Sequence, residues 1–158
     1  MKIQVKSLED TKKLAKCFVN SLDESGLFVT LTGDIGAGKT QFVRYVLEFL
    51  GTDKKVTSPS FVILNEYKTA KYPVYHFDLY RLEDKGLKSI VAELREYSKF
   101  GCLTFVEWAE FGKDEIPNNA FKINVEYDED DVDIRWFEFI GQNDSEAFFE
   151  RFKKEIGK

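Results

Sequence analysis

Apolar residues recur along this chain with the spacing of strands and of helices in alternation. Residues 27–32, Leu-Phe-Val-Thr-Leu-Thr, alternate and are rich in β-forming side chains, which predicts a strand. After a glycine-rich turn, apolar residues follow helical spacing up to Gly51, a typical helix stop: Phe42, Val43, Val46, Leu47 and Leu50. These residues predict a strand, a turn and an amphipathic helix in that order.

The same two periods predict most of the remaining elements. A strand at 3–5 precedes a helix that Ser7 can cap, and further strands follow at 74–78 and 102–107. The helix after Ser7 has one buried stripe: Leu14, Ala15, Phe18, Val19 and Leu22. A second stripe marks a helix between the two later strands: Leu87, Ile90, Val91 and Leu94.

The pattern changes near the C-terminus. Residues 121–127 and 132–140 look like two strands joined by the acidic segment 128–131, which predicts an antiparallel hairpin. No metal-ligand spacing accompanies the acidic segment, so a solvated turn is favoured over a metal site. Ser145 can cap a last helix with one apolar face: Phe148, Phe149, Phe152 and Ile156.

Alternating strands and helices predict an α/β fold with helices on both faces of a sheet. The expected architecture is a three-layer, P-loop NTPase-like domain. Its sheet is mostly parallel, with the antiparallel hairpin added near the C-terminus. We predict one domain over residues 1–158, because the sequence has no internal repeat, low-complexity tract or linker.

The glycine-rich turn carries the strongest chemical signal. Residues 33–40, GDIGAGKT, match the phosphate-loop pattern G-x-x-x-x-G-K-S/T between the predicted strand and helix. Backbone N–H groups at a helix N-terminus bind phosphate, Lys39 reaches the β- and γ-phosphates, and the Thr40 hydroxyl can hold Mg²⁺. The predicted nucleotide contacts are Asp34, Ile35, Gly36, Ala37, Gly38, Lys39, Thr40 and Gln41.

Two predicted strands end in an acid, Asp78 and Glu107. Ligands gather at the carboxyl ends of strands in such sheets, and a Mg²⁺ on Thr40 would meet both carboxylates. We favour Asp78 for the metal and Glu107 for the attacking water, with Glu107 also able to touch the metal. The predicted catalytic residues are therefore Lys39, Asp78 and Glu107. The alternatives without a role in catalysis are a helix N-cap for Asp78 and a surface salt bridge for Glu107.

A polar, helix-breaking segment at 56–67 offers two more candidates. Thr57 and Ser58 fall where loops that sense the γ-phosphate lie, although a turn anchored by Pro59 explains them equally well. His76, the only histidine, is more typical of a core residue and is assigned no chemistry. Trp108 either packs or reports on nucleotide binding through its fluorescence.

Composition narrows the class of protein. The chain has 158 residues, a net charge of −5 and a predicted pI of about 5.1, which argues against direct nucleic-acid binding through a broad basic surface. No apolar stretch is long enough for a membrane span, and residues 1–5 do not resemble a signal peptide. Cys17 and Cys102 have no C-x-x-C partner and are expected to be reduced. We therefore expect a cytoplasmic protein.

Several motifs together resemble the bacterial TsaE family, also called YjeE, over roughly residues 8–140. They are GDIGAGKT at 33–40, SPSF at 58–61, NEY at 65–67, YHFDLYR at 75–81 and VEW at 106–108. Ser60 stands where the family usually has threonine, and Ala109 where it usually has proline. The stretch 82–100 also lacks the family's usual acidic pattern, which puts the partner surface in doubt more than the nucleotide site.

The resemblance implies ATP binding, with ADP as product, and slow Mg²⁺-dependent hydrolysis. It implies a complex with the TsaD and TsaB proteins that makes threonylcarbamoyladenosine in tRNA, so that tRNA is met only indirectly. Lys39 and Thr40 carry over as phosphate and metal contacts, and Asp78 and Glu107 as the functional acids. The start of the first helix, residues 8–11, is expected to border the base.

Two other functions stay open at this point. A small-molecule kinase shares the phosphate loop, although the region after Glu107 has no arginine-rich lid. A non-catalytic, ATP-gated binding module would use the 57–61 loop to recruit a partner. No residue is identified as a built-in arginine finger, and Arg81 is only a speculative candidate.

Overall fold

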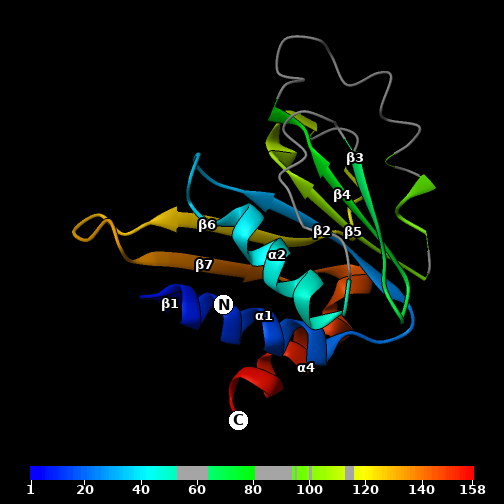
Figure 1. The fold of residues 1–158 in the computed structure, drawn as a ribbon, viewed down its shortest axis with the longest axis horizontal. Helices are drawn as coiled ribbons and strands as arrows, with labels where there is room; N and C mark the ends of the chain where they lie inside the picture. The colour runs from blue at the N-terminus through cyan, green and yellow to red at the C-terminus, as the bar shows by residue number, and fades with distance from the viewer. Residues whose placement is uncertain (53–63, 81–93, 95, 100, 113–115) are drawn as a thin grey trace.

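A single sheet of seven strands runs through the protein in the order β1-β7-β6-β2-β5-β4-β3 (Figure 1). The computed structural model describes residues 1–158 except 53–63, 81–93, 95, 100 and 113–115. The strands are β1 (Lys2–Val5), β2 (Gly26–Thr32), β3 (Leu64–Lys68), β4 (Pro73–Asp78), β5 (Cys102–Glu107), β6 (Phe121–Tyr127) and β7 (Arg135–Ile140).

The centre of the sheet is parallel and both edges are antiparallel. Strand β2 pairs in parallel with β5 and β6, and β4 with β5. The expected hairpin is β6–β7, although β7 starts at Arg135 rather than at residue 132. Strand β1 extends that edge antiparallel to β7, and β3 pairs antiparallel with β4 at the other edge. The α/β architecture with antiparallel additions is thus confirmed.

Helices α1 (Leu8–Ser21), α2 (Lys39–Phe49) and α4 (Glu146–Ile156) cover one face of the sheet (Figure 1). Ser7 caps α1 as predicted, since its hydroxyl accepts a hydrogen bond from the Asp10 amide at 3.1 Å. Short 3₁₀ turns η4 (Ala109–Gly112) and η5 (Asn143–Ser145) follow β5 and precede α4. In the part of the chain that the structure describes, no helix has the length and apolar character of a membrane span.

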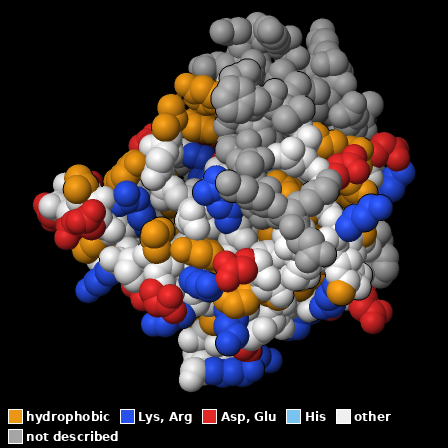
Figure 2. Space-filling view, viewed as in Figure 1, with side chains coloured by type: hydrophobic (Ala, Val, Ile, Leu, Met, Phe, Trp, Pro, Cys, Tyr) orange, Lys and Arg blue, Asp and Glu red, His pale blue; other side chains and the backbone are white. Residues whose placement is uncertain are grey.

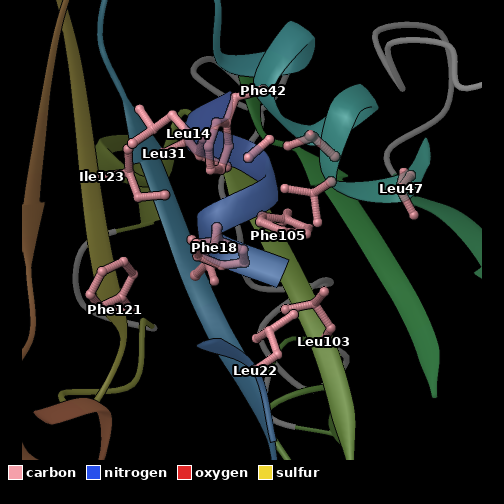
Figure 3. Close-up of a cluster of buried hydrophobic side chains, with 14 of the residues drawn as sticks. Leu14, Phe18, Leu22, Leu31, Phe42, Leu47, Leu103, Phe105, Phe121 and Ile123 are labelled. Atoms are coloured by element: carbon pink, nitrogen blue, oxygen red, sulfur yellow. The ribbon is translucent and has the colours of Figure 1, made fainter. Parts of the chain in front are cut away.

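Two apolar clusters lie on opposite faces of the sheet, because neighbouring strand residues alternate between them. On the helical face, Phe18 of α1 packs among other phenylalanine rings and Leu14, Leu31 and Leu103 lie nearby (Figure 3). On the opposite face, a smaller cluster contains Phe28, Phe77, Leu79, Leu94, Val106, Ala109 and Ala120. The predicted helix at 87–94 lies outside the described residues except for Leu94, which is buried in this second cluster.

Strand register brings the two predicted acids together. Asp78, the last residue of β4, pairs with Glu107, the last residue of β5, and Glu107 also pairs with Leu31 of β2. The phosphate loop leaves β2 at this same edge and enters α2. Both acids therefore lie at the end of the sheet from which the phosphate loop starts.

Phe18 offers a test of the main core. Its side chain has no exposed surface, and ring centroids of Phe42, Phe105, Phe121, Phe148 and Phe152 lie 4.9–6.3 Å from its own. We expect Phe18→Ala to lower the free energy of unfolding by about 3–5 kcal/mol in urea titrations, because it leaves a cavity. Val132→Ala, at a position 76% exposed, should change it by less than about 0.5 kcal/mol. Similar losses in both variants would contradict this packing.

Candidate functional site

The phosphate loop is held in a conformation that demands glycine at defined places. Gly38, the N-cap of α2, has φ of 111° and no neighbour where a Cβ would lie, so its backbone angle alone requires glycine. At Gly33, φ is 127° and a Cβ would also lie 2.0 Å from the Val125 carbonyl oxygen. The start of the loop is thus packed directly against β6.

Lys39 is buried in the loop and points back into it. Its Nζ donates hydrogen bonds to the carbonyl oxygens of Gly33 at 2.5 Å and Asp34 at 2.8 Å. The same atom lies 4.1 Å from the ring centroid of Trp108, a cation–π distance. Burial lowers the pKa of the Lys39 ammonium, and the negative charges of Glu107, Glu110, Asp78 and Asp34 oppose that shift. An additional anion beside Lys39 would therefore favour its charged form.

Glu107 connects the loop helix to the sheet. The Thr40 hydroxyl lies 2.8 and 2.9 Å from the two carboxylate oxygens, Oε1 and Oε2. The imidazole Nε2 of His76 lies 2.7 Å from Oε1. Glu107 is only 2% exposed, so the surface salt-bridge alternative is wrong. Three elements, α2, β4 and β5, meet at this one carboxylate.

Asp78 lies beside Glu107 in the sheet and is also buried. Its Oδ1 accepts a hydrogen bond from the Tyr80 amide at 3.0 Å, a local contact with the residue two positions on. The helix that Asp78 would cap in the alternative interpretation would extend into residues outside the described ranges. Asp78 also lines the same cavity as Lys39 and Thr40. The local contact and a place at the site therefore coexist.

Trp108 has a left-handed backbone with φ of 58°, which is uncommon for a large residue. Its amide donates to the Leu31 carbonyl at 3.0 Å, which holds the chain at the end of β5. The ring lies between Tyr80, at 4.9 Å, and Phe111, at 5.7 Å between centroids. This bend lets Glu107 and Trp108 face the same loop from successive positions.

Two cavities flank the loop. The first, of about 480 Å³, is lined by Gly36, Gly38, Lys39, Thr40, Asp78 and Glu107, among others. The second, of about 500 Å³, lies between the loop and the start of α1 and is lined by residues that include Leu8, Thr11, Gly36, Gln41, Asp133 and Arg135. Four loop or helix-start residues line the second cavity: Gly36, Ala37, Gly38 and Gln41. All but Ala37 also line the first cavity. The loop therefore separates a cavity that contains the acids Asp78 and Glu107 from a second cavity beside α1.

The structure adds residues that the sequence pattern did not single out. Arg44 and Tyr80 line the first cavity, and Arg44 follows Thr40 by one helical turn, a spacing that could have identified it. Burial raises the pKa of Glu110, beside the same site. Ile35 is 66% exposed on the loop. The candidates Thr57, Ser58 and Arg81 lie outside the described residues.

Charge on the molecular surface is mixed. On the face shown in Figure 2, the described Lys and Arg side chains are interspersed with Asp and Glu. Within the described ranges, no three or more His, Cys, Asp or Glu side chains gather as a metal-binding group.

A family model described as "Threonylcarbamoyl adenosine biosynthesis protein TsaE" matches residues 5–135. The chain belongs to the TsaE family. It is 34% identical over 131 residues to the Haemophilus influenzae protein named tRNA threonylcarbamoyladenosine biosynthesis protein TsaE, which covers 83% of this chain and 80% of that protein. The Bacillus subtilis protein of the same name is 36% identical over 133 residues, 84% of this chain and 82% of that protein.

A solved structure has the same fold. The crystal structure of YdiB from Bacillus subtilis superimposes with a TM-score of 0.79 at 29% identity, covering 99% of this chain and 95% of that chain. The resemblance drawn from the motifs is confirmed by these comparisons, as is the P-loop NTPase-like architecture.

Gly33 and Gly38 make a matched pair for testing the geometry of the phosphate loop. Gly38→Ala should lower the free energy of unfolding by about 1–2 kcal/mol, from backbone strain alone. Gly33→Ala adds a backbone clash with Val125 and should cost clearly more, measured by urea unfolding. Equal losses would contradict the close approach of the loop to β6.

Proposed function

We propose that this chain binds Mg-ATP and hydrolyses it slowly to ADP. The turnover would support the complex that makes N6-threonylcarbamoyladenosine in tRNA. The observation that carries the proposal is the convergence of Lys39, Thr40 and Glu107 at one cavity beside a complete phosphate loop. Such a site provides positioning and charge, which are the main requirements of phosphoryl transfer.

The oxygen donors at the site suit Mg²⁺. Thr40 Oγ1 and the Glu107 carboxylate oxygens lie 2.8 and 2.9 Å apart, so these two residues would hold the ion. When bound, Mg²⁺ supplies charge neutralisation for the β- and γ-phosphates. This contact favours Glu107 for the metal and leaves Asp78 to orient water, the reverse of the roles that the sequence favoured.

Lys39 would bind the phosphates. Its ammonium is already buried and donates hydrogen bonds to two carbonyl oxygens. It can therefore donate to phosphate oxygens instead, and the free-energy cost of removing the ammonium from water is already met in the folded protein. Arg44 lines the same cavity and adds a second positive charge. The loop residues from Asp34 to Gln41 would supply the remaining contacts through their backbone.

The second cavity is suited to the adenine base, as expected for residues 8–11. Leu8, which is 65% exposed, and Arg135 both line this cavity, and the Arg135 guanidinium carbon lies 4.1 Å from the Tyr127 ring centroid. The Tyr127 hydroxyl in turn donates to the Ile35 carbonyl at 2.9 Å. Arg135, at the wall of this cavity, is thereby linked through Tyr127 to the phosphate loop.

The proposed partners are TsaD and TsaB, in agreement with the role in threonylcarbamoyladenosine biosynthesis that the names of the relatives state. A net charge of −5 suits a protein that affects tRNA through partner proteins and not by direct binding. A role in tRNA modification also supports the proposal that the chain is cytoplasmic.

The base cavity can be tested separately from the phosphate site. Leu8→Ala should weaken ATP binding about 3- to 10-fold, because it removes roughly 1 kcal/mol of apolar contact, and should leave inorganic triphosphate binding unchanged. Val132→Ala is the control, since Val132 is also exposed but is not among the cavity residues. Isothermal titration would measure both ligands, and an equal loss for ATP and triphosphate would place the base elsewhere.

The function itself is tested by phosphate release from Mg-ATP, with the chain alone and with TsaD and TsaB. We expect stimulation by the partners and loss of at least about 100-fold in Lys39→Ala, because the phosphates lose their charged donor. Glu107→Gln should still bind ATP but release phosphate slowly. Lys13→Ala is the control, with a side chain 69% exposed on α1.

The same assay separates the rival functions. Transfer of the γ-phosphate to an added metabolite instead of water would indicate a kinase. Full pathway activity with a non-hydrolysable ATP analogue would indicate an ATP-gated binding module. Unchanged, partner-dependent hydrolysis by folded Lys39→Ala would refute the assignment of the site.

A further inference from the structure

His76 has an unusual environment for a core residue. It lies in β4, two residues before Asp78, and its side chain has no exposed surface. Nε2 lies 2.7 Å from Glu107 Oε1, whereas Nδ1 has no hydrogen-bond partner in the part of the chain that the structure describes. One ring nitrogen is thus hydrogen-bonded, and the other is buried with no partner among the described residues.

Burying a ring nitrogen without a hydrogen-bond partner costs free energy, and an apolar residue at this position would not carry that cost. A buried nitrogen without a partner loses its hydration, and a leucine of similar size would fill the same strand position without that loss. The hydrogen bond between Nε2 and Glu107 offsets this cost. An ionised carboxylate can only accept, so Nε2 carries the hydrogen and donates to Glu107.

The contact fixes Glu107 from the sheet side. Oε1 receives both His76 Nε2 and the Thr40 hydroxyl, and Oε2 lies 2.9 Å from the same hydroxyl. A Thr40 hydroxyl that turned toward a metal would give up its hydrogen bonds to Glu107. The hydrogen bond from His76 would persist, because β4 and β5 are paired along their length.

We propose that His76 is a positioning residue that holds the Glu107 carboxylate in the orientation required for Mg-nucleotide binding and hydrolysis. This inference rests on the proposed function. It assigns a role in the site to a histidine for which the sequence indicated only a place in the core. Partners of this kind, behind a metal ligand, commonly affect metal affinity or activity by about 10- to 100-fold.

The test compares His76→Leu with His76→Gln in the full chain. Leucine keeps the apolar bulk and removes the donor, whereas the glutamine amide nitrogen can reach a position close to that of Nε2. We measure the affinity for a non-hydrolysable ATP analogue by titration, in EDTA and in Mg²⁺, and phosphate release in the presence of TsaD and TsaB. In wild type, Mg²⁺ should tighten analogue binding.

We expect His76→Leu to lose most of the tightening by Mg²⁺ and about 10- to 100-fold in turnover, with its affinity in EDTA unchanged. His76→Gln should recover most of both quantities. Phe105→Leu is the stability control, because Phe105 pairs with His76 in the sheet and is fully buried but belongs to the apolar core. It should lower the melting temperature without affecting the response to Mg²⁺.

Each outcome decides between the possible roles. A wild-type response to Mg²⁺ and wild-type turnover in His76→Leu would overturn the inference, as would equal losses in His76→Leu and Phe105→Leu. If wild type itself neither tightens in Mg²⁺ nor releases phosphate, the proposed function fails and the role of His76 falls with it. The two failures are therefore distinguishable.

Discussion

The buried carboxylate of Glu107 is the constraint on which the rest of the site depends. Removing a carboxylate from water is costly unless donors replace the lost hydration. Here the donors come from α2, through Thr40, and from β4, through His76, while the backbone of Glu107 continues the ladder of β5. Satisfying this one group therefore fixes the first turn of the loop helix against two strand ends, and the phosphate loop takes its position from that contact.

Local signals predicted much of the structure. The Ser7 cap, the phosphate loop with its helix and the β6–β7 hairpin were all predicted, because each depends on residues close in sequence. Strand β3 was missed. Its sequence, Leu-Asn-Glu-Tyr-Lys, has little β-forming character, and the segment becomes a strand because it pairs along its whole length with β4 at the sheet edge.

The functional geometry was only partly predictable, because it depends on contacts between distant parts of the chain. The position of Glu107 at a strand end favoured a functional role, but its partners Thr40 and His76 lie 67 and 31 residues away. Strand ends alone could not decide which acid would face Thr40. Likewise, residues 8–11 could be associated with the base only by resemblance. The cavity that supports this association combines the start of α1, the loop and β7, three segments that only the sheet order brings together.

The internal contacts of Lys39 have a consequence for how tightly any ligand can be held. Its ammonium already donates to Gly33 and Asp34 and lies over the Trp108 ring. A phosphate oxygen that accepts from Lys39 exchanges one set of charge-assisted contacts for another, and the same holds for the Thr40 hydroxyl beside Glu107. Binding strength is then a difference between two well-satisfied arrangements. The carbonyl oxygens of the loop and the Glu107 carboxylate therefore compete with any ligand for these donors, which lowers the net free energy gained on binding.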